Sequence, residues 1–184
     1  MLRRLLSCRT HWQQSLVLDL VRGGGSAPEA TRVEVGCSAI GNYTYSFARN
    51  DGQNHGHNSL FVMECQIIEA EGQGKTVRLV NSANHVIRSR PEYRGRIKTP
   101  KNVTNNQPFT AALFARRQIG KPYNDQFWNN RKVEATHSNC SQLVWAAWMY
   151  AAKIDLDNDG KGGVCPEDLW KSSQSWLVRY MEKA

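Results

Sequence analysis

One cysteine in the sequence stands in a setting that suits a nucleophile. Cys140 follows three polar residues, 137–139, and shortly precedes the apolar run LVWAAWMYAA at residues 143–152. Apolar side chains on every face predict a helix buried within the domain, with Cys140 at its N-terminal end. Unpaired backbone N–H groups and the positive end of the helix dipole stabilise a thiolate there and lower the pKa of the thiol. The same N–H groups could stabilise the oxyanion that forms during acyl transfer.

A cysteine at the edge of an apolar helix can be a small buried hydrophobe instead of a nucleophile. The residues that could lie near Cys140 therefore distinguish the two interpretations. A nucleophilic cysteine needs a base, and among the five histidines His57 leads directly into the apolar run SLFVM, which predicts a rigid strand beneath it. If that strand turns near residues 64–66, the returning strand brings Glu69 or Glu71 back toward His57. Either carboxylate could then orient the imidazole and stabilise its protonated form.

The elements that must position these residues begin with short strands. Three apolar clusters within residues 59–80 are five residues or fewer and are separated by polar or glycine turns. This spacing predicts a meander of antiparallel strands. A further short strand is expected within residues 32–50, and Ile97 marks another.

Two helices are expected to follow the strands. Pro108 in a first turn, Gly120 at the C-terminus and Pro122 beyond it predict a helix over residues 108–119. The helix of the apolar run is expected to start at Cys140 or Ser141 and to end near Lys153. Either Ser138 or Asn139 can serve as its N-cap.

Length and composition favour one compact domain. The chain has 184 residues, of which 40% are hydrophobic and 22% charged, and no apolar stretch approaches the ~18 residues of a membrane span. Residues 23–30, GGGSAPEA, are typical of a flexible linker, so residues 1–30 are expected to be an extension and residues 31–184 the domain. The basic N-terminus is interrupted by polar residues, which argues against a cleavable export signal.

Charge and cysteine content allow two further expectations. The net charge is +8, and residues 78–101 concentrate lysine and arginine against the single acid Glu92. A polyanionic partner such as nucleic acid or a wall polymer would fit, but a solvated basic face is the simpler interpretation, since interleaved stacking aromatics are absent. The five cysteines are dispersed and have no CxxC spacing, which favours free thiols.

Four motifs in a fixed order resemble a known family. GHNSLFVMECQIIEAEG, ARRQIGKPYN, NCSQLVWAAW and IDLDNDGKGGVCPEDLW look like the YiiX/YebB-like (YycO-like) branch of the NlpC-type papain-like cysteine hydrolases, over about residues 35–172. The resemblance implies a circularly permuted papain-like α+β fold, in which an antiparallel sheet packs against a buried helix with the cysteine at its N-terminus. It places the nucleophile on Cys140, the general base on His57 and the orienting acid on Glu69.

The resemblance also implies a reaction and its surroundings. Tyr123, in the GKPYN match, would line the active-site cleft, and Ser141, next to the nucleophile, would contact the substrate. The expected activity is cleavage of an amide bond through a thioester acyl-enzyme, with peptidoglycan as one candidate substrate. No metal or other cofactor is expected, and the chain is expected to be monomeric.

Two other function classes remain open from the residues. His55 and His57 form an HxH pair that could bind zinc with His85, His137 or a cysteine, although a metallohydrolase spacing such as HExxH is absent. A non-catalytic module that binds a polyanion on the same fold is the other alternative.

A third pattern resembles the start of a calcium loop. DLDNDG places Asp155, Asp157 and Asp159 at alternate positions with Gly160 sixth, but the twelfth position is Pro166 and lacks the bidentate glutamate. We therefore interpret this stretch as a turn after the helix.

Overall fold

A six-stranded antiparallel sheet organises the protein, with strand order β4-β3-β2-β1-β5-β6. The computed structural model describes residues 38–41, 56–63, 66–81 and 94–182, so the predicted extension and linker at residues 1–30 lie outside the described residues. The strands are β1 (Ser38–Gly41), β2 (His57–Met63), β3 (Gln66–Ala70), β4 (Val77–Asn81), β5 (Arg94–Pro100) and β6 (Ser175–Glu182). Consecutive pairing of β2, β3 and β4 is the meander that the apolar clusters predict.

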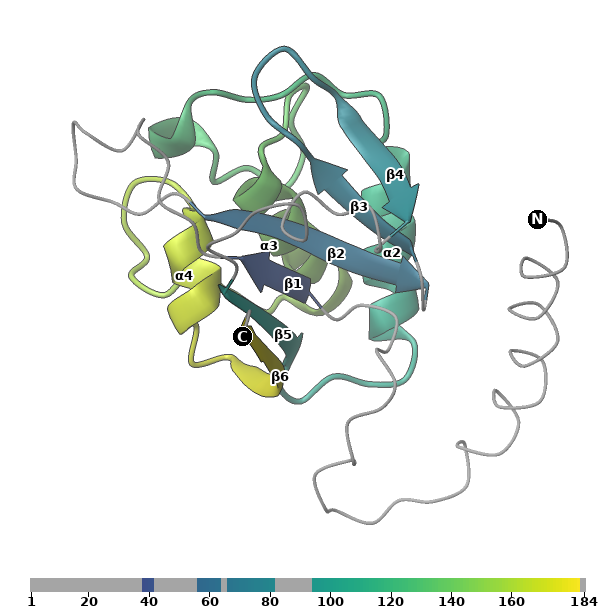
Figure 1. Ribbon diagram of the computed structural model, residues 1–184, viewed down its shortest axis with the longest axis vertical. Helices are drawn as coiled ribbons and strands as arrows, with labels where there is room; N and C mark the ends of the chain where they lie inside the picture. The colour runs from purple at the N-terminus through teal and green to yellow at the C-terminus, as the bar shows by residue number, and fades with distance from the viewer. Residues whose placement is uncertain (1–37, 42–55, 64–65, 82–93, 183–184) are drawn as a thin grey trace, which may run out of the picture.

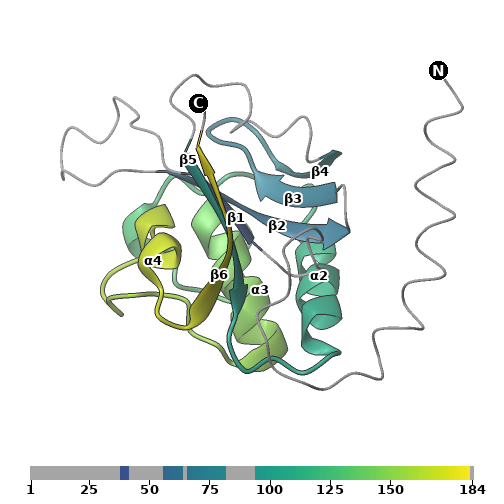
Figure 2. The same ribbon diagram turned by 60° about the horizontal axis from the view of Figure 1, so that its bottom comes forward.

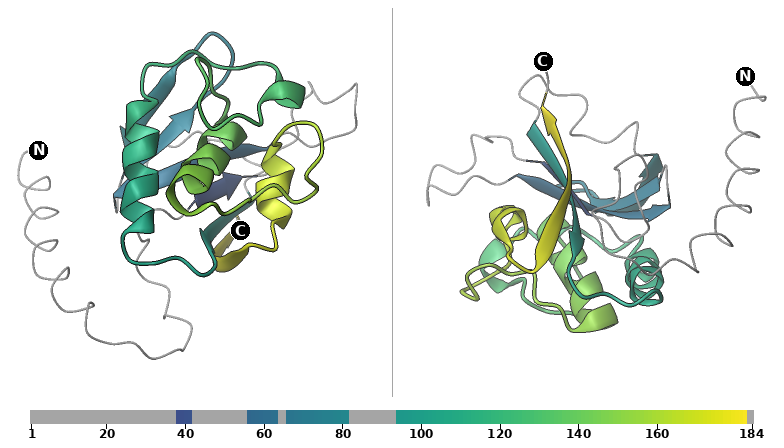
Figure 3. Two further views of the ribbon diagram at one scale, coloured as in Figure 1. Left: turned by 180° about the vertical axis from the view of Figure 1, so that it is seen from behind. Right: turned by 90° about the horizontal axis from the view of Figure 1, so that it is seen from below.

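The helices of the described segments lie together on one face of this twisted sheet (Figures 1 and 2). They are α2 (Gln107–Arg117), the 3-10 turn η6 (Phe127–Asn129), α3 (Cys140–Ala152) and α4 (Pro166–Lys171). The views from behind and from below show α3 in the middle of the helical layer, between α2 and α4 (Figure 3). The architecture is therefore a two-layer α+β fold.

Helix α3 is the centre of the hydrophobic core. Leu143, Val144 and Trp148 are fully buried, and the helix packs against β2 and α2. This confirms the burial that the uniformly apolar run predicts. Within the described residues, no helix is both long and apolar enough to span a membrane.

Strand β2 is buried on both of its faces. Leu60 and Val62 pack into the core beneath the helices, whereas Phe61 packs with Ile67 and Ile97 in a smaller cluster on the opposite face. Successive side chains of a strand alternate between faces, so any polar residue near the start of β2 is held in a buried environment.

The C-terminal elements α4 and β6 have no counterpart in the elements predicted above. Strand β6 pairs with β5, and basic side chains in and just after β5 contact both α4 and β6. Lys98 Nζ donates to three main-chain carbonyl groups at the C-terminal end of α4, each at 3.0 Å. The Arg96 guanidinium lies 4.1 Å from the ring centre of Trp170, and Lys101 Nζ lies 4.2 Å from that of Trp176. These three cations of the basic segment therefore have partners within the molecule.

Candidate active site

Three side chains form a diagonal row across β2, β3 and β4. Ser59 is opposite Glu69, and Glu69 is opposite Arg78. His57 shares the face of Ser59, because residues two apart on a strand point the same way. His57, Glu69 and Arg78 therefore lie on one face of three adjacent strands.

Hydrogen bonds run along the whole row. His57 Nε2 lies 2.9 Å from Glu69 Oε2, and Arg78 donates to Glu69 Oε1 from Nη2 at 2.8 Å and from Nε at 3.1 Å. Glu69 is fully buried, so its charge requires such partners. Glu71, the other acid considered for the contact with His57, accepts from Arg78 Nη1 at 3.0 Å. The acid in contact with the imidazole is Glu69.

Cys140 is the first residue of α3, and its position is fixed by the N-cap. The Asn139 side chain accepts the Gln142 N–H at 2.9 Å, which is the standard N-cap contact. The same Asn139 oxygen also accepts from Asn130 Nδ2 at 3.1 Å. Two N–H donors thus hold one oxygen beside the cysteine, which makes the start of α3 rigid.

The side chains of His57 and Cys140 are hydrogen-bonded to each other, and each shifts the pKa of the other. They are 4% and 2% exposed, and burial alone would lower the pKa of His57. The hydrogen bond with Cys140, then that with Glu69, and the two negative charges outweigh burial and raise the pKa of His57 to about 9. Because Nε2 is bonded to Glu69, we infer that Nδ1 is the ring nitrogen that faces Cys140.

The thiol responds in the opposite direction. Burial alone would raise the pKa of Cys140, but the hydrogen bond with His57 and its positive charge lower it, as do the backbone N–H groups of Asn58 and Ser141. The pKa of Cys140 is therefore below its ordinary value while that of His57 is above it. The two opposite shifts favour the thiolate–imidazolium form of the pair.

The two predicted substrate-binding residues have partners in the fold. Ser141 is fully buried, and its hydroxyl donates to the Val164 carbonyl at 2.6 Å. Tyr123 packs against the core, with its ring centre 6.5 Å from that of Phe127 in an edge-on arrangement. Roles for Ser141 and Tyr123 in substrate binding remain predictions.

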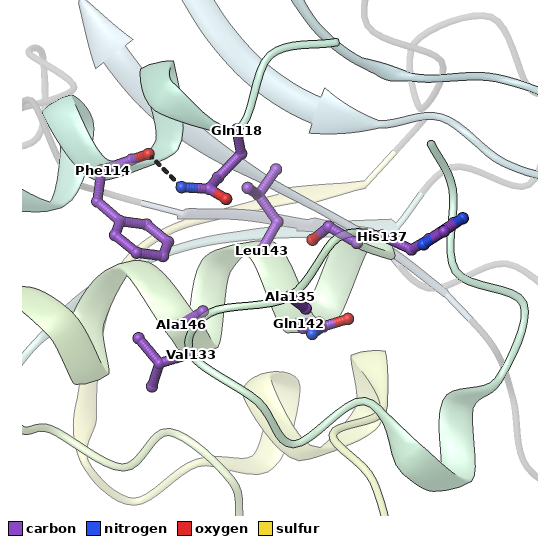
Figure 4. Close-up of a pocket in the computed structure, with 9 residues that line it drawn as sticks. Phe114, Gln118, Val133, Ala135, His137, Gln142, Leu143 and Ala146 are labelled. Atoms are coloured by element: carbon purple, nitrogen blue, oxygen red, sulfur yellow. Dashed lines mark hydrogen bonds between the residues drawn. The ribbon is translucent and has the colours of Figure 1, made fainter. Parts of the chain in front are cut away.

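A small pocket lies beside the start of α3, between α2, α3 and the segment before α3 (Figure 4). His137 lines it through its main chain, while its imidazole points away and its Nδ1 lies 3.0 Å from Thr136 Oγ1. Neither Cys140 nor His57 lines this pocket. Its lining residues are Phe114, Gln118, Val133, Ala135, His137, Ser138, Gln142, Leu143 and Ala146.

Three residues that support the site are absent from the predicted set. Arg78 was grouped with the basic segment, although its place opposite Glu69 follows once the strands are paired. Asn130 is fully buried; besides its bond to Asn139, it donates to the Val164 carbonyl at 2.7 Å and accepts the Val164 N–H at 2.6 Å. Gly163 allows this approach, because a Cβ there would lie 1.5 Å from a main-chain oxygen of η6. No local sequence signal marks Asn130 or Gly163.

The acidic loop after α3, taken together with the adjoining first turn of α4, forms a second group of ionisable side chains. Among the described residues, Asp157, Asp159 and Asp168 are the group whose donor atoms all lie within 4.8 Å, a spacing suited to a metal ion. Asp157 also lies 3.2 Å from Arg131 Nη1. Asp155, the first residue of the calcium-like pattern, instead accepts the Trp145 indole N–H at 2.9 Å.

This arrangement bears on both metal alternatives. Asp157 Oδ1 accepts the N–H groups of Asp159 and Gly160, as in the predicted turn. The group does not contain His57 or Cys140, and the zinc-ligand candidates His55 and His85 lie outside the described residues.

The sequence was compared with protein-family models and with known proteins. No family model matches the chain. The sequence is 30% identical over 159 residues to the uncharacterized protein YycO of Bacillus subtilis (strain 168), and the match covers 86% of this chain and 61% of YycO. The chain thus spans less than two thirds of the length of that relative.

The fold is similar to the crystal structure of the metalloprotein YiiX from Escherichia coli O157:H7. The TM-score is 0.64 at 15% sequence identity, and the match covers 83% of this chain and 99% of the YiiX chain. The chain is thus similar to YycO in sequence, and its likeness to YiiX shows the fold alone. Neither name states an enzymatic activity.

Proposed function

We propose that this protein is a cysteine-dependent hydrolase of the amidase or peptidase type, with a circularly permuted papain-like arrangement. The observation that carries the proposal is the continuous chain of contacts Cys140–His57–Glu69, in which the pKa of the thiol is lowered and that of the imidazole is raised. In this order along the chain, the base on β2 precedes the nucleophile on α3. Two groups whose environments push their pKa values apart are typical of a catalytic pair.

The reaction would proceed in two halves. The Cys140 thiolate attacks the amide carbonyl carbon, and the resulting tetrahedral intermediate expels the amine, which takes a proton from His57. This step leaves a thioester on Cys140. His57, now neutral, then removes a proton from a water molecule that attacks the thioester, and the carboxylic acid and the Cys140 sulfur are released.

Glu69 has an orienting role in this scheme. Its hydrogen bond with Nε2 fixes the ring so that Nδ1 faces the sulfur, and its negative charge stabilises the imidazolium. Arg78 donates twice to the other carboxylate oxygen and so provides a positive charge beside the buried Glu69. The substrate class we favour is a peptide amide, with bacterial peptidoglycan as the first material to test.

The experiment is to incubate the purified protein with peptidoglycan fragments and a panel of peptide amides, and to detect an acyl-enzyme by mass spectrometry. A mass increase equal to the acyl group on the peptide that contains Cys140 supports the proposal. Activity should survive EDTA and disappear on alkylation of Cys140.

The same assay distinguishes the alternatives. Loss of activity in EDTA with recovery in zinc would favour the metal-dependent hydrolase, an alternative compatible with the description of YiiX as a metalloprotein. If every amide is left intact and Cys140 alkylates no faster than an ordinary thiol, the polyanion-binding module becomes the better hypothesis.

A further inference from the structure

A buried side-chain amide beside the nucleophile lacks a hydrogen-bond partner. Asn58, the second residue of β2, is 0% exposed, and across the described part of the chain neither its Nδ2 nor its Oδ1 is hydrogen-bonded. Leaving such a group unpaired destabilises the folded state. The fold itself does not call for an amide here, because Leu60 and Val62, which share its face, are apolar. An unpaired buried amide in a residue that contacts the nucleophile is therefore a candidate for a functional role.

Asn58 is in direct contact with the reactive sulfur through its main chain. The pairing of β2 with β3 ends at Ser59 and Glu69. One residue nearer the start of β2, the Asn58 N–H is hydrogen-bonded to Cys140 instead. The sulfur therefore lies beside the backbone of β2, at the point where β3 has separated from it.

The side chains on either side of this point differ in chemistry. His57 lies on the face of Glu69, whereas Asn58 lies on the face of Leu60 and Val62, against which α3 packs. The sulfur thus contacts the His57 side chain, from one face of β2, and the main chain of Asn58, whose side chain lies on the other face. In a carbonyl group attacked by this sulfur, the leaving amine and the oxygen point in different directions. His57, on one face, can serve the leaving amine, and Asn58, on the other face, can serve the oxygen.

We propose that the Asn58 side chain is a catalytic residue that donates a hydrogen bond from Nδ2 to the oxyanion of the tetrahedral intermediate. This inference rests on the proposed function. As the sulfur–carbon bond forms, the carbonyl π electrons move onto oxygen, and that negative charge accepts the Nδ2–H. When the intermediate collapses, the carbonyl re-forms and the amine leaves with the proton of His57. A preorganised donor of this kind stabilises the transition state more than the ground state.

The test is Asn58→Leu, which keeps the branched shape of the side chain and removes its donor. Turnover of the amide substrate should fall about 10²- to 10³-fold. The rate at which Cys140 reacts with iodoacetamide, and its pH dependence, should stay unchanged, because the main-chain N–H and His57 remain. Thermal stability should be maintained or increased, because an unpaired buried amide is replaced by an apolar group.

Ser59→Ala is the matched control. Ser59 is the next residue on β2, is also fully buried, and has a hydroxyl without a hydrogen-bond partner in the described part of the chain. It lies on the other face of the strand, so its loss should leave turnover within about threefold of wild type. Asn58→Ala provides a second variant in case leucine disturbs the packing, and circular dichroism checks the fold of each.

The outcomes separate the two proposals. If the wild-type protein turns over amides and both Asn58 variants, correctly folded, do so equally well, the oxyanion role is wrong while the hydrolase stands. An equal loss of turnover and of Cys140 alkylation would also overturn it, since Asn58 would then act on the thiolate. A wild-type protein without any acyl-enzyme or turnover would instead refute the hydrolase itself.

Discussion

Two groups of charged side chains differ in how their charges are arranged. In the row across β2, β3 and β4, the imidazolium of His57, the carboxylate of Glu69 and the guanidinium of Arg78 alternate in sign. In the acidic loop, Asp157, Asp159 and Asp168 bring like charges within 4.8 Å. The row places each charge beside a charge of opposite sign, whereas the acidic group places like charges around Asp168.

The pKa of Asp168 shows the consequence. Burial raises it, the N–H of Cys165 lowers it, and the negative charges of Asp157, Asp159 and Glu167 raise it further, to about 6. Paired strands with complementary charges thus hold a reactive ion pair, while a loop of like charges holds a carboxyl group close to protonation. Substitutions in the row and substitutions in the acidic loop should therefore affect different properties of the protein.

The largest effects should come from Cys140 and His57, the two residues that react with the substrate. Cys140→Ala removes the nucleophile and His57→Ala the proton donor, so both should abolish detectable amide turnover. His137→Ala is the control, because its imidazole is exposed and points away from the nearby pocket; its activity should be close to wild type. An inactive His137→Ala together with an active His57→Ala would refute the permuted arrangement.

A smaller loss is expected at the orienting end. Glu69→Gln keeps an acceptor for the imidazole but loses the charge, and kcat should fall roughly 10- to 1,000-fold. Arg78→Gln should cost less, about tenfold, because Arg78 is 40% exposed and acts only through Glu69. Glu71→Gln serves as the matched control, since it removes the other partner of Arg78 and leaves Glu69 intact. A loss for Glu71→Gln equal to that for Arg78→Gln would argue against the row as a functional unit.

The pairing of Cys140 with His57 predicts different pH profiles for alkylation of the thiol and for amide turnover. Alkylation of Cys140 should become fast at a lower pH than alkylation of an ordinary thiol, because its pKa is lowered, and should stay high at alkaline pH. Amide turnover needs a protonated His57 as well, so it should fall as the pH rises through about 9. Rates of iodoacetamide labelling and of hydrolysis from pH 5 to 10 provide the measurement. Parallel profiles would contradict the thiolate–imidazolium pair.

The sequence predicted those parts of the fold that are specified within one segment. The apolar run after Cys140 predicted α3 and its burial, because no polar face was available for solvent. Asn139 was one of two N-cap candidates, since a short polar side chain before such a run can accept the free N–H groups. The contact of His57 with Glu69 followed from pairing two short strands across one turn.

Features that depend on distant segments were not predictable in this way. In the sequence, Arg78 is indistinguishable from the other cations of the basic segment. Its role becomes apparent only when β4 is paired with β3, which places it opposite Glu69. The strand β6 pairs with β5 across some 75 residues of sequence, and its exposed Trp176 and Leu177 give it no alternating pattern. The unpaired amide of Asn58 is likewise visible only when the surrounding structure shows what it lacks.

The smallest effect should come from the acidic loop, and it should appear in stability rather than in turnover. The folded-state pKa of Asp168 is raised from 3.8 to about 6, so the native state binds this proton more tightly than the unfolded chain does. Its contribution to stability is then complete below about pH 4 and is lost as the pH rises through 6. Asp168→Asn should remove this pH dependence.

At pH 7 this variant should match or exceed wild type in its free energy of unfolding, by on the order of 1 kcal/mol, because solvent screens a partly exposed carboxylate. Its amide oxygen can still accept the Cys165 N–H that Asp168 accepts at 2.7 Å, so α4 should keep its N-terminal cap. Urea denaturation of both proteins at pH 4 and pH 7 measures the difference, and amide turnover should be unchanged. A wild-type melting temperature that rises in millimolar calcium, and an Asp168→Asn protein that does not respond, would contradict the turn and show that the like charges serve a cation.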